Sequence, residues 1–77
     1  MISLEEFVKN IELEIEDLEP GELTAEINYR DIETWSSMYA LIIIAYVDSE
    51  FNVTLSGDDL RKCNTLKELY FLIKSKV

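Results

Sequence analysis

The sequence of 77 residues predicts an all-α fold with three main helices, one short helix and a long first connection. Three observations lead to this prediction. Apolar residues recur at intervals of three and four, Ser or Thr precedes each such stretch, and only one stretch is rich in β-branched residues. That stretch, Leu41 to Val47, resembles a buried strand when taken alone, but no comparable second strand exists to pair with it. We expect a single domain over residues 1–77.

The first helix is expected over residues 4–18. Ser3 and Glu6 form the pattern of a capping box, and Pro20 follows the last apolar residue. Leu13 lies off the apolar stripe and is expected to be partly exposed. The stripe itself consists of Leu4, Phe7, Val8, Ile11, Ile15 and Leu18.

Residues 19–36 form a connection that is too long to be a plain turn. Residues 31–34 can form a single helical turn within it. We expect the connection to pack on the core through its apolar residues, which are Leu23, Ile27, Tyr29, Ile32 and Trp35.

The second helix is expected over residues 37–51, with Ser36 as its N-cap, because the Ser36 oxygen can accept a hydrogen bond from the first turn. We expect one buried face, made of Met38, Ala40, Leu41, Ile44 or Ala45, Val47 and Phe51. Further apolar residues surround the same helix, namely Tyr39, Ile42, Ile43 and Tyr46. A chain of this size cannot bury them all, so we expect part of this apolar surface to be exposed, as it often is at contact sites.

The third helix is short and is expected over residues 57–62. Ser56 is its N-cap, and Asp58 and Asp59 lie in the first turn, where the helix dipole favours acidic residues. Cys63 follows this helix and is expected to pack as a small residue between the third and fourth helices.

The fourth helix begins after Thr65, which forms a further capping-box pattern with Glu68. Its apolar face is expected to consist of Leu66, Leu69, Tyr70 and Ile73. Lys74 and Lys76 lie near its C-terminal end, where the helix dipole favours basic residues.

The net charge of −9 is unevenly distributed. Only Lys9 and Arg30 of the seven basic residues precede residue 61, whereas all of the sixteen acidic residues except Glu68 do. Such a chain repels the phosphates of nucleic acids, so we expect no nucleic-acid partner, and it favours encounter with basic protein surfaces. The absence of histidine excludes any mechanism that needs an imidazole base within the chain.

The single cysteine permits no internal disulfide, and neither His, Asp nor a second Cys lies near Cys63 to form a metal site. The N-terminal sequence lacks the pattern of a signal peptide. The longest apolar run, residues 38–47, is shorter than the roughly 20 residues of a membrane span. We therefore expect a soluble, cytoplasmic and monomeric protein with no bound metal.

Four short segments of the chain occur in an order and at spacings typical of a known family. They are Trp35-Ser36-Ser37-Met38, Glu50-Phe51-Asn52-Val53-Thr54-Leu55, Ser56-Gly57-Asp58-Asp59-Leu60 and Cys63-Asn64-Thr65-Leu66-Lys67-Glu68-Leu69. Together they resemble the phosphopantetheine-binding carriers, the acyl and peptidyl carrier family. The family motif reads Asp-Ser-Leu, often with Trp before it. Ser36 stands here in place of the Asp, and Met38 stands in place of the Leu.

The resemblance implies an acyl-carrier-like four-helix bundle that catalyses nothing itself. It implies 4′-phosphopantetheine, taken from coenzyme A and attached to Ser37, with Ser36 and Met38 flanking the attachment and Trp35 contacting the arm. An acyl or aminoacyl group would be carried on the arm as a thioester. The implied partners are a phosphopantetheinyl transferase and acyl or aminoacyl ligase or synthase enzymes. Their contacts would fall on Met38, Ile42, Tyr46, Asp58 and Asp59.

Other interpretations of the same residues remain open. Ser37 alone is an ordinary residue at a helix start, and its role would then be local. A carrier fold that is never modified would act as a binding module. Two departures from the family favour this interpretation, namely Ser36 in place of the Asp and Ile42 at a helix position where members of the family usually display an acidic residue. An unrelated four-helix adaptor would use the apolar second helix to dimerise.

Overall fold

The computed structural model describes residues 1–77 as an all-helical chain without strands, as the sequence predicts. Three α-helices are long and one is short, and a single 3₁₀ turn, η1, lies in the first connection. The elements are α1 (Leu4–Glu14), η1 (Tyr29–Asp31), α2 (Ser37–Phe51), α3 (Gly57–Lys62) and α4 (Leu66–Lys76). None of these helices has the length and apolar character needed to cross a membrane.

Side-chain caps begin two of the long helices, at the positions that the sequence predicts. The Ser3 hydroxyl accepts a hydrogen bond from the N–H of Glu6 at 3.2 Å, and the Thr65 hydroxyl accepts one from Glu68 at 3.2 Å. The Glu68 carboxylate in turn accepts from the N–H of Asn64 at 2.7 Å, one residue before the N-cap. These bonds satisfy N–H groups that the first turn of a helix otherwise leaves without partners.

The first helix ends one turn earlier than predicted. Ile15 leaves the helical conformation, with φ −103° and ψ 94°, although it and Leu18 are both buried. A turn replaces the expected helical end, and the N–H of Leu18 donates to the carbonyl of Ile15 at 3.1 Å. The last turn of α1 contains no basic residue, and acidic residues at a helix C-terminus oppose the helix dipole. Apolar spacing alone therefore overestimated the length of this helix.

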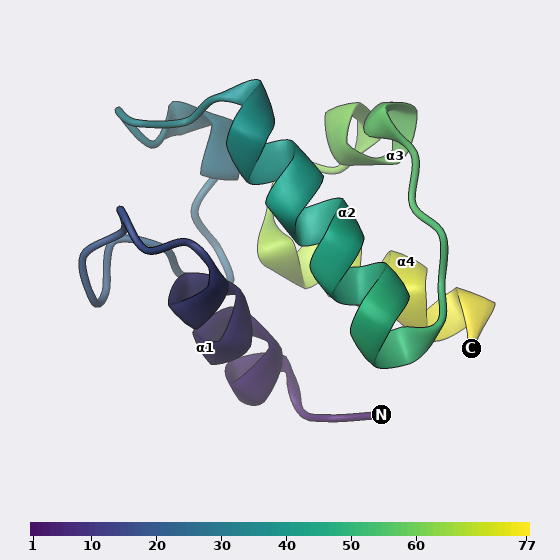
Figure 1. Ribbon diagram of the computed structural model, residues 1–77. Coiled ribbons are helices and arrows are strands. Elements are labelled where there is room, and N and C mark those ends of the chain that lie inside the picture. The colour runs from purple at the N-terminus through teal and green to yellow at the C-terminus, as the bar shows by residue number, and fades with distance from the viewer.

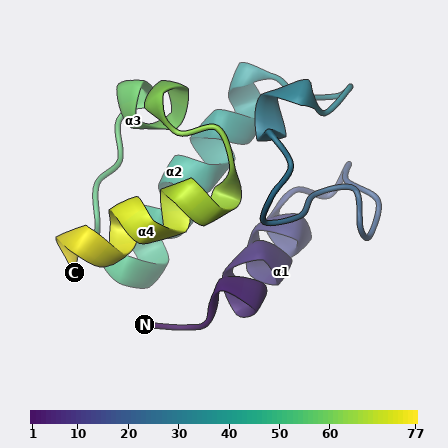
Figure 2. The same cartoon turned by 180° about the vertical axis from the view of Figure 1, so that it is seen from behind.

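Helix α1 packs against α2 and α4, and the long connection lies at the end of the bundle away from the chain termini (Figures 1 and 2). Phe7 of α1 is fully buried among aromatic rings from these neighbours. Its ring centroid lies 6.3 Å from that of Tyr46, 6.1 Å from that of Phe51 and 5.6 Å from that of Tyr70. The 19 buried residues are all apolar or aromatic and form one cluster.

The buried face of α2 differs from the predicted one. Tyr39, Ile43, Tyr46 and Val47 are buried, whereas the side chains of Met38 and Leu41 are 64% and 65% exposed. Apolar residues surround this helix, so the sequence pattern gives no direction to its inner side, and contact with α1 decides it. The expectation that α2 keeps exposed apolar surface is confirmed.

The first connection packs on the core as predicted, except that Ile27 is 38% exposed and does not take part. Its helical turn lies slightly earlier than predicted, at η1. The Asn28 side chain accepts from the N–H of Arg30 at 3.0 Å and caps this turn. Backbone hydrogen bonds fix the connection to α4, because Ala25 accepts from the N–H of Lys67 and Tyr29 donates to the carbonyl of Asn64, both at 3.1 Å. The connection therefore holds a fixed position beside the start of α2.

Candidate functional site

Ser37 is the first residue of α2, and its side chain is exposed. Ser36 occupies the N-cap position with φ −148° and ψ 171°, but its side chain makes no capping hydrogen bond. Contrary to prediction, no side-chain cap begins α2, whereas α1, α3 and α4 all have one. Free N–H groups at the positive end of a helix dipole favour an anion. The start of α2 therefore combines an exposed hydroxyl with an environment that suits negative charge.

A groove of about 440 Å³ opens beside Ser37 and is lined by residues of the first connection, α2 and α3. Five apolar residues make up most of its lining, and two arginines, Ser37 and Gly57 complete it. The lining residues are Arg30, Trp35, Ser37, Ala40, Leu41, Ile44, Gly57, Leu60 and Arg61. An arm attached to Ser37 would begin at the edge of this groove.

Trp35 joins the first connection to the start of α2. Its ring centroid lies 5.0 Å from that of Tyr29 and 5.8 Å from that of Tyr39, with the latter pair edge-on at 89°. The side chain is half-buried, so part of it packs in this aromatic cluster while it also lines the groove. Its predicted role as an anchor of the connection is confirmed. Its contact with an arm stays a prediction.

Tyr29 and Arg30 bind the C-terminal end of α3 from the first connection. The Tyr29 hydroxyl contacts the carbonyls of Leu60 and Cys63, the latter at 2.8 Å, and the Arg30 guanidinium donates to the same two carbonyls at 2.8 and 2.7 Å. The guanidinium also donates to the side-chain oxygen of Asn64. Carbonyls at a helix C-terminus lack partners within the helix, so this pair caps α3. Burial raises the pKa of Tyr29 to about 12.

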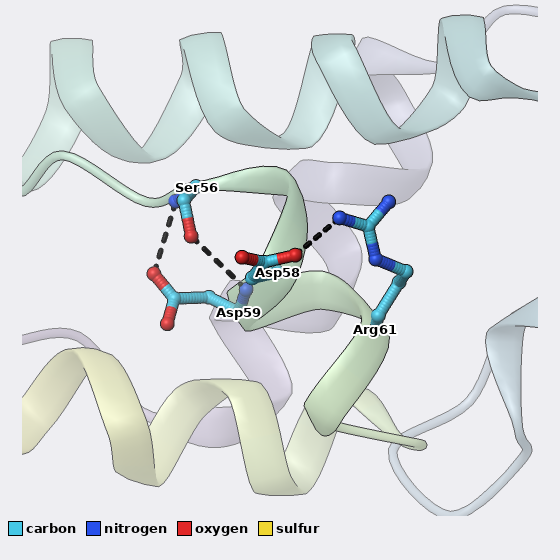
Figure 3. Close-up of polar contacts among 4 residues, drawn as sticks. All are labelled: Ser56, Asp58, Asp59 and Arg61. Atoms are coloured by element: carbon cyan, nitrogen blue, oxygen red, sulfur yellow. Dashed lines mark hydrogen bonds and ion pairs between the residues drawn. The ribbon is translucent and has the colours of Figure 1, made fainter.

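The start of α3 contains the two acidic residues predicted to contact partners (Figure 3). Asp59 forms a capping box with Ser56, in which each side chain accepts from the other residue's N–H, at 2.9 and 3.1 Å. The hydrogen bond from the Ser56 backbone holds the pKa of Asp59 below its ordinary value. Asp58 is exposed and forms an ion pair with Arg61, whose guanidinium extends from α3 toward α2. The Asp59 carboxylate thus has a structural role in addition to any contact.

Tyr46, which is predicted to contact partners, is almost fully buried. Its side chain is 9% exposed, and its hydroxyl accepts a hydrogen bond from the Asn10 side-chain amide at 3.1 Å. Ile42 is half-buried on the same side of α2, where α1 packs. Met38 and Leu41 are both exposed on α2, but they border different hollows: Met38 lies beside Glu14 and Glu16 at the end of α1, and Leu41 lines the groove next to Ser37.

The structure brings together Trp35, Ser36, Ser37 and Met38 at the start of α2, as their positions in the sequence require. Sequence reasoning missed the groove and seven of its nine lining residues, which are Arg30, Ala40, Leu41, Ile44, Gly57, Leu60 and Arg61. One signal was present, because Ser37, Leu41 and Ile44 follow the spacing of a single helical face.

The site combines an exposed hydroxyl with an adjoining groove. Burial raises the pKa of the Cys63 thiol, which favours its neutral form. No group of three or more Cys, His, Asp or Glu side chains is placed to hold a metal ion. No family model, curated protein or solved structure matches the chain.

Proposed function

We propose that the protein is an acyl carrier-like protein that holds an acyl or aminoacyl group as a thioester on 4′-phosphopantetheine attached to Ser37. A phosphopantetheinyl transferase would join the Ser37 oxygen to the phosphorus of the pantetheine phosphate. The pyrophosphate bond of coenzyme A breaks in this step, and adenosine 3′,5′-bisphosphate and a proton leave. Acyl or aminoacyl ligases or synthases then charge the thiol and use the thioester.

The observation that carries this proposal is the position of Ser37. It is exposed, it begins a helix of 15 residues, and it borders the groove. A carrier needs a reachable hydroxyl on a rigid element, and the start of a packed helix provides one. The phosphodiester formed there would lie at the uncapped N-terminus of α2, where the helix dipole and N–H groups favour an anion.

The groove supports the proposal because it gives the arm or its cargo a place beside the attachment point. Its lining includes Trp35, Leu41 and Ile44, which would bury the apolar parts of an attached group. The exposed side chains of Met38 and Leu41 would meet partner enzymes next to the same site.

The first experiment is an intact-mass measurement after incubation with coenzyme A, magnesium and a broad-specificity phosphopantetheinyl transferase. We expect the chain to gain the mass of one phosphopantetheine. Ser37→Ala should gain none, whereas the matched control Ser36→Ala should still be modified. Modification of Ser37→Ala, or loss of modification only in Ser36→Ala, would exclude Ser37 as the attachment residue.

If the chain gains no mass while a control carrier does, Ser36→Asp separates two explanations. One is a carrier that needs a dedicated transferase, and the other is a binding module that is never modified. This variant restores the residue that the family motif contains before the modified Ser. Gain of mass in Ser36→Asp would show an intact acceptor that needs a dedicated transferase.

A second candidate function is an unmodified binding module, and the exposure of Met38 and Leu41 favours it, since apolar patches of this kind mark contact surfaces. Failure of both the natural chain and Ser36→Asp to gain mass would support this candidate over the carrier.

A further inference from the structure

The groove beside Ser37 differs in charge from every other hollow on the molecule. Sixteen of the 77 residues are acidic, yet no carboxylate lines this groove. Each of the other three hollows contains at least two carboxylates. Their acidic residues are Glu14 and Glu50 in one, Glu5 and Glu26 in another, and Glu14, Glu16 and Asp17 in the third. An anionic group would therefore be repelled from those three hollows and not from this one.

Both arginines of the chain line the same groove. Arg30 uses part of its guanidinium to bind the carbonyls of α3 and the side chain of Asn64, and Arg61 uses part of its own to bind Asp58. A guanidinium has five N–H donors, so both groups keep donors for a ligand. The Arg61–Asp58 pair is exposed, at 74% and 71%, and exposed pairs are weak. Arg61 can therefore exchange Asp58 for another carboxylate at little cost.

We propose, on the basis of the carrier function proposed above, that this groove selects acyl cargo whose far end carries a carboxylate. The apolar lining would hold the hydrocarbon part of the cargo, through Leu41, Ile44 and Leu60. The far end would meet the guanidinium groups, which bind carboxylates with favourable geometry. Arg61 is then the specificity-determining residue, because Arg30 is already committed to the fold through three acceptors.

A tethered-ligand experiment tests this proposal without a transferase. In a Cys63→Ala background, Ser37→Cys is alkylated with chains of equal length that end in a methyl, a carboxamide or a carboxylate. Two-dimensional NMR then follows the amides of Ala40, Ile44 and Gly57, and thermal unfolding gives the stability of each adduct. The carboxylate-ended adduct should shift these amides furthest and unfold at the highest temperature. The difference between adducts should shrink as salt is added, because salt screens exposed charges.

Two charge variants identify the group responsible. Arg61→Gln should reduce the extra stability of the carboxylate-ended adduct. The reduction should correspond to about a threefold change in the folding equilibrium constant, the size expected for an exposed ion pair. Lys62→Gln is the matched control. It removes the same charge from the next residue along the chain, and the Lys62 side chain does not line the groove. This control should keep the preference.

Equal behaviour of the three adducts, or equal loss in Arg61→Gln and Lys62→Gln, would overturn the proposal. The tether contains no phosphate, so a preference can come only from the end of the chain. If the carboxylate-ended adduct shows no preference, the guanidinium groups do not select the cargo and would be available to bind the phosphate of the arm. Loading of the natural chain is measured separately by intact mass, so failure of the carrier function and failure of this selectivity are separate results.

Discussion

Tyr29 shows how a single side chain in a loop affects both stability and its pH dependence. Its hydroxyl contacts the carbonyls of Leu60 and Cys63, and burial raises its pKa to about 12. A tyrosine in the unfolded chain has a pKa of about 10. The folded state therefore holds the proton more tightly, so the stabilisation is complete below about pH 10 and is lost as the pH rises toward about 12.

Tyr29→Phe should lower the free energy of unfolding at neutral pH by about 1 kcal/mol, because the Arg30 guanidinium still satisfies the two carbonyls. The variant should also lose less stability between about pH 10 and about pH 12 than the natural chain does. Urea unfolding at several pH values measures both effects. Some alkaline loss should remain, because burial also raises the pKa of Tyr46. Parallel pH curves for the two proteins would contradict this account of Tyr29.

At the level of elements, the C-terminal end of α1 is an unfavourable helix terminus. Its last turn contains no basic residue, and Glu14 also shares a surface hollow with Glu50. Glu14→Lys should raise the free energy of unfolding by about 0.3–1 kcal/mol, because it places a positive charge at the negative end of the helix dipole. Thermal or urea unfolding measures the change.

Glu5→Lys is the matched control for this prediction, because it makes the same charge change in the first turn of α1. A basic residue there opposes the dipole, so stability should fall. If both variants changed stability in the same direction, net charge rather than the dipole would be responsible.

Helix starts were predictable from the Ser and Thr residues that precede them, whereas Pro20 did not mark the end of α1, which lies at Glu14. Residues 37–51 and 57–62 were predicted and observed as helices, and Asn52 ends α2 in the left-handed conformation with φ 58°. The inner face of α2 was not predictable, because apolar residues surround the helix and only contact with α1 chooses a side. The groove was not predictable either, since Arg30 and Arg61 come together only when the connection folds onto α3.

For the molecule as a whole, repulsion between like charges limits stability. The chain carries sixteen acidic and seven basic residues, and the Arg61–Asp58 pair is its only ion pair. That pair is exposed, so screening it costs little, whereas screening the repulsion among the acidic residues favours the compact state. Raising the salt from about 10 mM to about 150 mM shortens the screening length from about 30 Å to about 8 Å.

The free energy of unfolding should therefore rise by about 1 kcal/mol over this range of salt, which corresponds to a Tm increase of about 4–8 °C in a domain of this size. Differential scanning calorimetry in NaCl measures the change. Glu14→Lys carries a less negative charge, so its Tm should depend less on salt. A Tm that falls with salt would show that attraction between the acidic body and the basic C-terminal segment dominates instead.

The attachment of α3 by a loop affects how the molecule opens. This helix has six residues, and Tyr29 and Arg30 bind its C-terminal carbonyls from the first connection rather than from a neighbouring helix. Its amide hydrogens should therefore exchange with solvent through a local opening, ahead of those in α1, α2 and α4. The same opening would move Leu60 and Arg61 away from α2. The release of two loop residues, Tyr29 and Arg30, would then set the rate at which the groove opens and closes.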